Sequence, residues 1–177
     1  LPHWISEFQR ACPSMRVKQM YHQSCTDMDR AWDELWEAYP HFDVVVTTYE
    51  KIMAFTDEFR AMRWNVLVLD EGHLVKNEKS ERALAIRRLF FFHSLILTGT
   101  PIQCDLHELW SLLNFLLPEI FKDSGVFDKA FGARSLEDQK ARSEAWDNIH
   151  DLMSHCMLRR LKSEVDDSIP LKTETKI

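Results

Sequence analysis

The chain has 177 residues, 45% of them hydrophobic, and a formal net charge of −6 at pH 7. This length corresponds to about one domain, and the apolar content is typical of a globular protein with a buried core. The absence of any long uncharged apolar run excludes a transmembrane helix, and we expect no membrane partner. The acidic balance argues against a protein that coats DNA through general basic charge.

Apolar spacing and turn residues predict alternating helices and strands along the first two thirds of the chain. Helices are predicted at 3–11, 29–39, 50–62, 78–90 and 105–117. Strands are predicted at 15–21, 43–49, 65–69 and 94–97. Short apolar strands between amphipathic helices indicate an α/β fold with a parallel sheet that helices cover on both faces. Beyond this sheet, 122–134 is a looser segment, 136–160 is mostly helical, and 166–177 is polar and extended.

Two adjacent carboxylates, Asp70 and Glu71, directly follow the apolar strand at 65–69. Mg²⁺ prefers hard oxygen ligands and usually keeps several waters, so one carboxylate at a strand end is enough to hold it together with phosphates. The second carboxylate can orient the attacking water in phosphoryl transfer. An ordinary acidic turn is the alternative, and His73 together with the motif after the next strand argues against it.

That motif is Thr-Gly-Thr-Pro, which begins at Thr98. Gly99 permits an unusual backbone geometry, and the hydroxyls of Thr98 and Thr100 can bridge to carboxylates or phosphate oxygens. Ligands of parallel α/β sheets bind at the carboxyl ends of the strands. We therefore expect Thr47, Asp70 and Thr98 to lie at one edge of the sheet.

These motifs resemble the first ATPase lobe of Snf2-type chromatin remodellers, in helicase superfamily 2. The most specific part is the helix at 106–118, which reads Leu-His-Glu-Leu-Trp-Ser-Leu-Leu-Asn-Phe-Leu-Leu-Pro and which plain DExH RNA helicases lack. Segments 4–8 and 46–50 resemble motifs Ia and Ib, and segments 75–80 and 158–165 look closest to the ISWI-like branch. The resemblance implies a RecA-like lobe 1 of the P-loop NTPase type, truncated at its N-terminus, over 1–117. A helical Snf2-type extension would occupy 118–165, and a linker toward a missing second lobe would occupy 166–177.

The resemblance also implies ATP and Mg²⁺ as cofactors and assigns roles to residues of this chain. Asp70 would hold Mg²⁺ through water and Glu71 would activate the attacking water, with Gln103 also binding the nucleotide. His73 would couple the nucleotide site to motif III, which comprises Thr98, Gly99 and Thr100. Contacts to DNA phosphates, of the kind that position rather than read sequence, would come from Thr47, Thr48, Lys76 and Asn77.

Several of these residues also have simpler interpretations. Thr47 and Thr48 are alternatively plain strand-end hydroxyls. For Trp4 and Phe8 we favour core packing over DNA contact, because both lie at helical spacing on an apolar face. Two basic clusters are interpreted either as solvated helix faces or as surfaces for DNA phosphate or the second lobe: Arg82, Arg87 and Arg88, and Arg159, Arg160 and Lys162.

The sequence departs from the family pattern at three positions, since Cys104 and Asp105 replace two Asn residues and Leu74 replaces a common Arg. None of the four glycines precedes Asp70, so the chain carries no Gly-rich phosphate loop. We expect a fragment of a longer remodeller that, without this loop and the second lobe, does not turn over ATP. A catalytically dead RecA-like interaction or regulatory module is the alternative, and a DExH RNA helicase is a third. For the intact protein the resemblance implies double-stranded DNA, nucleosomes and remodelling-complex subunits as partners, and a nuclear location.

Overall fold

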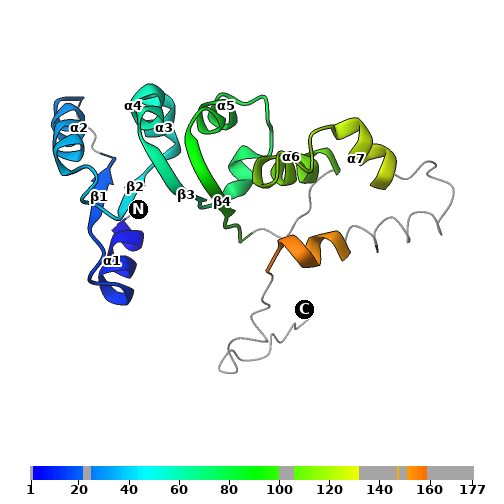
Figure 1. Ribbon diagram of the computed structural model, residues 1–177, viewed down its shortest axis with the longest axis horizontal. Coiled ribbons are helices and arrows are strands. Elements are labelled where there is room, and N and C mark those ends of the chain that lie inside the picture. Colours follow the sequence, from blue (N-terminus) through cyan, green and yellow to red (C-terminus); the bar gives the residue numbers. More distant parts are fainter. Residues whose placement is uncertain (1, 22–24, 100–105, 132–146, 148–150, 159–177) are drawn as a thin grey trace, which may run out of the picture. The chain divides into compact units, whose positions relative to one another are not determined.

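The computed structural model describes residues 2–21, 25–99, 106–131, 147 and 151–158 (Figure 1). The chain forms two compact units, Leu1–Ser124 and Gly125–Ile177. The strands of the first unit are β1 (Val17–Met20), β2 (Val44–Thr47), β3 (Arg63–Leu69) and β4 (Phe90–Ile96). Its helices are α1 (Pro2–Ala11), α2 (Cys25–Ala38), α3 (Tyr49–Ala54), α4 (Thr56–Ala61), the 3₁₀ helix η1 (Gly72–Val75), α5 (Glu81–Arg87) and α6 (Leu106–Leu116).

The strands pair in parallel, as the alternating pattern predicted. β1 pairs with β2, with Val17 opposite Val44, and β3 pairs with β4, with Leu69 opposite Ile96. Figure 1 shows α2 to α5 on one side of the strands and α1 on the other. The predicted α/β class is therefore confirmed, although the strands of the described residues form two sheets of two strands each and not one sheet.

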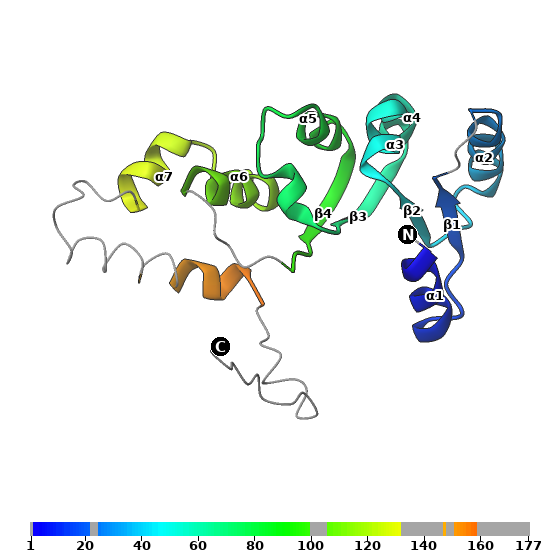
Figure 2. The ribbon, with the colours of Figure 1, turned by 180° about the vertical axis from the view of Figure 1, so that it is seen from behind.

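The core of the first unit lies between these strands and the helices on the α2 to α5 side. Its most buried members include Met20, Leu35 and Phe59, which are at most 2% exposed. The ring of Trp32 on α2 packs edge-on against Phe59 on α4, with centroids 4.7 Å apart. α6 runs beside β4, where Phe91 and Phe115 place their rings 5.8 Å apart (Figure 2). Within the described residues, no helix combines the length and the apolar character needed to cross a membrane.

Three predicted boundaries are wrong for identifiable reasons. The helix predicted at 50–62 is two helices, because Phe55 leaves helical geometry at φ −126° and ψ 40°. The helix predicted at 78–90 is shorter, since Ser80 caps its first turn by accepting from the N–H of Ala83. β4 starts at Phe90 and not near Ser94, because Phe90 pairs with Arg63.

One apolar face of the β3–β4 pair is open, which contradicts the expectation of a sheet covered on both faces. Val66 and Val68 on β3 are 54% and 49% exposed, and Leu95, which is opposite Val68, is 50% exposed. On the other face, Leu69 is buried and Ile96 is partly buried. Within the described residues, the first face is thus only partly covered.

α7 (Ser124–Phe131) begins at the last residue of the first unit and lies otherwise in the second unit, which also contains a helical segment at 151–156. α7 occupies the segment that was predicted to be looser. Its Phe127 is buried, with its ring 4.7 Å from that of Phe131 one turn later. The predicted helix over 136–160 and the predicted tail over 166–177 fall mostly or wholly outside the described residues.

Candidate functional site

The acidic pair lies where two neighbouring parallel strands end. The β3–β4 ladder continues past the strands, since the N–H of Leu97 donates to the carbonyl of Leu69 at 2.8 Å and that of Gly72 donates to the carbonyl of Leu97 at 2.9 Å. Asp70 thus follows β3 directly, and Thr98 follows the end of β4. The expectation of one shared sheet edge is therefore confirmed for Asp70 and Thr98, but it is wrong for Thr47, which ends β2 in the separate β1–β2 sheet.

Asp70 is held by donors from three different places in the chain. The indole N–H of Trp4 on α1 donates to Oδ2 at 2.8 Å, and the backbone N–H of Glu71 donates to Oδ1 at 3.0 Å. The hydroxyl of Tyr49, the first residue of α3, donates to the backbone carbonyl of Asp70 at 2.7 Å. Because a carboxylate oxygen offers about two lone-pair directions, each oxygen keeps acceptor capacity for a water.

Tyr49 is itself enclosed by its neighbours. Burial, and next the negative charge of Asp70, raise the pKa of Tyr49 to about 12. The guanidinium of Arg82 on α5 lies over its ring, 5.4 Å from the centroid, and Nη2 of Arg82 is 3.8 Å from Oε1 of Glu50. The Tyr49 hydroxyl therefore stays protonated across the physiological range and acts as a donor.

Glu71 has a backbone conformation that its residue type rarely adopts. It lies in the left-handed region at φ 51° and ψ 48°, and among the described non-glycine residues it alone has a positive φ. Its side chain is 55% exposed, with Oε2 3.3 Å from Nδ1 of His73. Such strained positions cluster at functional sites, and here the strain turns the chain from β3 into η1.

Gly72 and Gly99 differ in whether the structure leaves room for a larger side chain. A Cβ on buried Gly72 would overlap the side chain of Ile96 on β4, so only glycine lets η1 approach the strand this closely. A Cβ on Gly99 would meet nothing within 4 Å, and its φ is not positive. The expectation that Gly99 supplies an unusual backbone geometry is therefore wrong.

The donor set at the strand ends fits a magnesium ion held through water. Among the described residues, no three His, Cys, Asp or Glu side chains gather to form a metal cage. Mg²⁺ is commonly bound by one or two carboxylates with several retained waters, and Asp70 and Glu71 supply hard oxygens of that kind. No Gly-rich loop that could hold phosphates precedes these two carboxylates in the sequence.

The two threonines that were candidates for DNA contact have local bonds. The hydroxyl of Thr47 donates to the carbonyl of Met20 at 2.6 Å and joins the ends of β1 and β2. The hydroxyl of Thr48 accepts from the N–H of Lys51 at 3.2 Å and caps α3. Each hydroxyl retains capacity for a further partner, so these bonds explain the residue types without testing the DNA role.

The other two candidates lie just after η1. Nζ of Lys76 is 2.8 Å from Oε1 of Glu108 on α6. Asn77 shapes the turn before α5, because its side-chain oxygen accepts from the N–H of Lys79 at 3.0 Å. Next to this pair, Nε2 of His107 on α6 is 3.3 Å from Oε1 of Glu78. α6 is thus bound to the segment that follows the acidic pair.

The arginines of α5 do not form one solvated face. Arg82 lies over Tyr49, and Arg88 pairs with Asp57 at 3.2 Å on the surface. Arg87 donates to Oδ1 of Asn114 at 2.8 Å and to the carbonyl of Ser111 at 3.2 Å. Each arginine has a different protein partner, so the interpretation as one solvated helix face is wrong, and contact with DNA phosphate or with the second lobe stays a prediction.

Several predicted residues lie outside the described part of the chain. They comprise two site residues, the turn proline, the two positions that depart from the family pattern and the second basic cluster: Thr100, Gln103, Pro101, Cys104, Asp105, Arg159, Arg160 and Lys162.

Sequence reasoning missed the residues that position Asp70. Trp4 is only half-buried and is not a member of the hydrophobic core, so core packing was the wrong interpretation of this side chain. The available signal was chemical: Trp and Tyr carry a polar group that usually finds a partner when the ring is buried. The sequence alone does not reveal that both partners belong to Asp70.

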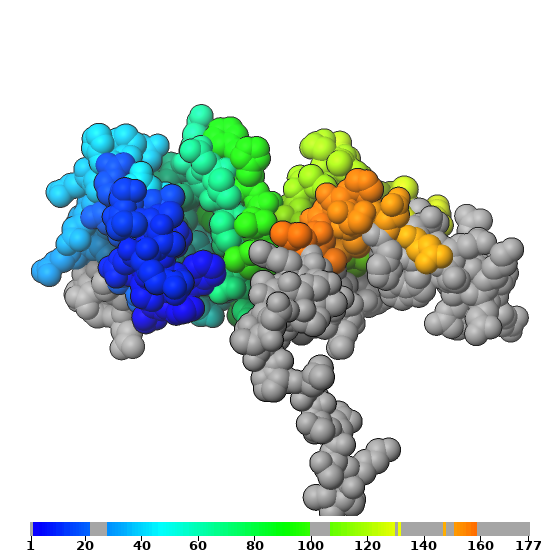
Figure 3. Space-filling model, turned by 90° about the horizontal axis from the view of Figure 1, so that it is seen from below, coloured from blue at the N-terminus to red at the C-terminus, as the bar shows by residue number. Residues whose placement is uncertain are grey.

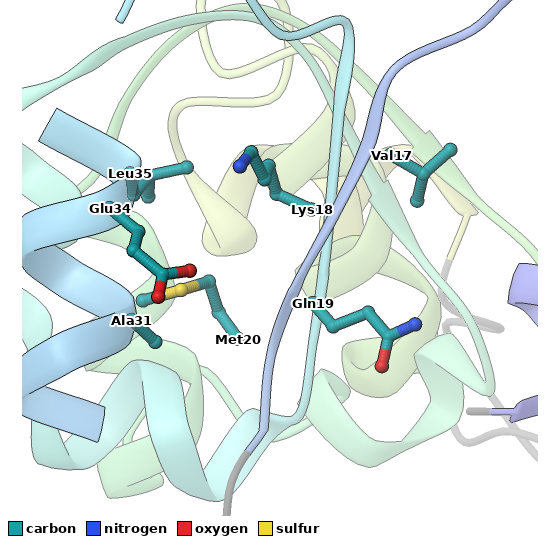
Figure 4. A pocket seen from close by; sticks show the side chains of 7 residues that line it. All are labelled: Val17, Lys18, Gln19, Met20, Ala31, Glu34 and Leu35. Atoms are coloured by element: carbon teal, nitrogen blue, oxygen red, sulfur yellow. The ribbon is translucent and has the colours of Figure 1, made fainter. Parts of the chain in front are cut away.

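A separate hollow of about 200 Å³ lies between β1 and α2 (Figure 4). Lys18 and Met20 of β1 point toward the helix, whereas Val17 and Gln19 point away, as strand alternation requires. On α2 its lining is Ala31, Glu34 and Leu35. It has no cluster of chemically reactive side chains, so the acidic pair remains the candidate site.

The chain is similar to known chromatin proteins along its whole length. The model of the SNF2-related domain matches residues 1–177. The chain is 39% identical to the human SWI/SNF-related matrix-associated actin-dependent regulator of chromatin subfamily A member 1, over the whole chain and 16% of that protein. It is 36% identical to the Saccharomyces cerevisiae ISWI chromatin-remodeling complex ATPase ISW2, over the whole chain and 15% of that protein.

The fold has a solved counterpart in the Sulfolobus solfataricus SWI2/SNF2 ATPase core in complex with dsDNA. The TM-score is 0.72 at 24% sequence identity, and the match covers 94% of this chain and 33% of that chain. This likeness shows a shared fold. The chain spans about one sixth of the length of the curated relatives that it matches.

Proposed function

Since the chain belongs to the SNF2-related domain family, we propose that it is the carboxylate-bearing part of an ATP-hydrolysing lobe. In the full-length gene product it would couple magnesium-dependent ATP hydrolysis to movement on double-stranded DNA and to nucleosome remodelling in the nucleus. A second lobe and remodelling-complex subunits would be its protein partners. We also propose that the chain is organised as a RecA-like lobe over 1–117, a helical extension over 118–165 and a linker over 166–177.

The observation that carries this proposal is the arrangement around Asp70. Donors from two separate helices fix Asp70, because Trp4 on α1 holds a side-chain oxygen and Tyr49 on α3 holds its backbone carbonyl. Glu71 beside it is strained and exposed. A rigid carboxylate next to an accessible second one is what water-mediated magnesium binding and water activation require.

The residues of this chain would divide the chemistry as follows. Asp70 would accept hydrogen bonds from waters of Mg²⁺, an ion that neutralises phosphate charge. Glu71 would orient the attacking water and accept its proton. His73, 3.3 Å from Glu71, would hold that carboxylate in place and connect it to Thr98 and Thr100.

The test is Glu71→Gln in the full-length gene product, because the amide preserves size but cannot accept a proton. We expect nucleotide binding to remain within about twofold and DNA-stimulated ATP hydrolysis to fall by 10² or more, since a positioned base contributes roughly 10²–10⁴. Glu58→Gln on the exposed side of α4 is the matched control and should hydrolyse ATP normally. Normal hydrolysis by Glu71→Gln would remove Glu71 from this role.

A non-catalytic interaction or regulatory module is the second candidate. One observation favours it: all four glycines come after the acidic pair in the sequence, so this chain has no Gly-rich phosphate loop before that pair. The reading frame upstream of Leu1 distinguishes the candidates, because a Gly-rich loop ending in Gly-Lys-Thr there supports the ATPase. Unrelated sequence there, with no ATPase activity in the full-length product, supports the module.

A further inference from the structure

Trp4 reaches the candidate site from a helix that lies 66 residues earlier in the chain. Its Nε1 is 2.8 Å from Oδ2 of Asp70, a normal hydrogen-bond length between a neutral donor and a carboxylate. The indole is half-buried, and its ring packs against Phe8 one turn later with centroids 6.3 Å apart. The N–H direction is thus set by the packing of α1, which forms part of the surface in Figure 3.

Asp70 has few rotational alternatives once this bond forms. Glu71 N–H holds the other carboxylate oxygen, and Tyr49 holds the backbone carbonyl. The Glu71 bond is local to the turn and the Tyr49 bond does not touch the side chain. The Trp4 indole is therefore the contact that ties the carboxylate to a distant element of the fold.

We propose that Trp4 is a positioning residue for Asp70, so that the placement of α1 determines how well this carboxylate accepts magnesium-bound water. The proposal rests on the function proposed above, because it assigns Asp70 to magnesium. Loss of a partner that orients a metal-binding group typically lowers metal affinity or activity by 10–100-fold. A movement of α1 would therefore reach Asp70 through this bond.

The first test asks whether the bond exists in solution, with the 177-residue chain labelled with ¹⁵N. Its six tryptophans give six indole N–H signals at most, and Trp4→Phe identifies the one from Trp4. We expect Asp70→Ala to shift that signal upfield, because the charged acceptor is lost, and to leave the signal of Trp36 in place. A Trp4 indole signal whose chemical shift does not change in Asp70→Ala would overturn the proposal.

The second test separates positioning from general stability, in the full-length gene product. Trp4→Phe keeps the ring and its packing but removes the donor, and we expect the Mg²⁺ concentration for half-maximal ATPase activity to rise about tenfold. The DNA concentration for half-maximal activity should stay within twofold. Trp36→Phe, on the exposed part of α2, should change neither. An unchanged magnesium requirement in Trp4→Phe would overturn the proposal.

Failure of the proposed ATPase function can be told apart from failure of the Trp4 proposal. A wild-type full-length protein without ATPase activity would remove that function, and the Trp4 proposal would then be decided by adding MgCl₂ to the labelled chain at constant ionic strength. The Trp4 indole signal must move with magnesium in wild type and stay still in Asp70→Ala. Equal behaviour of the two proteins would overturn the proposal.

Discussion

Arg87 on α5 donates from Nη1 to Oδ1 of Asn114 on α6 at 2.8 Å, and this bond joins the helix before β4 to the helix after it. Arg87 also donates to the carbonyl of Ser111 and lies over the ring of Phe115, 5.4 Å from its centroid. Asn114 continues the connection, because its Nδ2 donates to the carbonyl of Phe121 at 2.8 Å. α6 is thus held by specific polar contacts as well as by apolar packing.

We therefore expect Arg87→Ala to lower the free energy of unfolding by about 2–3 kcal/mol, since hydrogen bonds from charged groups contribute about 1.5–3 kcal/mol. Urea unfolding of the chain measures this. Arg88→Ala is the control, because its pair with Asp57 is on the surface, and exposed pairs contribute about 0–1 kcal/mol. Equal losses in the two variants would show that Arg87 does not hold α6.

Gly72 and Gly99 should respond in opposite ways to alanine. Gly72→Ala forces the new methyl group against Ile96, and overpacking costs about 1–3 kcal/mol. Gly99→Ala meets open space at an ordinary φ, so it should be neutral or stabilise by up to about 1 kcal/mol. Thermal unfolding compares the two. Removing the clash with Ile96→Ala should reduce the cost of Gly72→Ala in a double-mutant cycle, and simple additivity would contradict the assigned contact.

The left-handed conformation of Glu71 predicts an unusual order of stabilities. Glycine adopts this region without the steric cost of about 1–2 kcal/mol that other residues meet, so Glu71→Gly should be about 1 kcal/mol more stable than Glu71→Ala. At an ordinary turn position with negative φ the order would be reversed. Denaturant unfolding of both variants decides, and an alanine variant as stable as the glycine variant would mean that the strain is absent in solution.

Asp43 predicts a pH dependence at the start of β2. Hydrogen bonds from the Arg16 side chain, and next from its backbone N–H, lower the pKa of Asp43 from 3.8 to about 2. Because the folded-state pKa lies below the unfolded one, this contribution to stability is complete above about pH 4 and is lost as the pH falls toward 2. Carboxyl NMR titration should give a pKa near 2 in wild type and a value closer to 3.8 in Arg16→Met. The same low value in both proteins would exclude Arg16 as the cause.

Much of the local structure could be predicted from the chain because it depends on neighbours in sequence. Valine-rich runs such as that at Val44–Thr47 indicate strands, and apolar spacing indicates a helix such as α5, although its start at the Ser80 cap was missed. Strand ends were less predictable, since Phe90 joins β4 only through pairing with Arg63, which lies 27 positions earlier. The break at Phe55 also had no clear signal, because the residues around it have helical spacing.

The sequence by itself determined the α/β class, the acidic pair at a strand end and the membership of a family, since each depends on short runs of residues in fixed order. Only the tertiary structure decided what holds Asp70, where each arginine of α5 goes and which face of β3 and β4 stays open. The physical reason is distance along the chain. No periodic pattern or fixed spacing in the sequence predicts a hydrogen bond between residues 66 positions apart. This bond forms only because packing brings α1 to the end of β3.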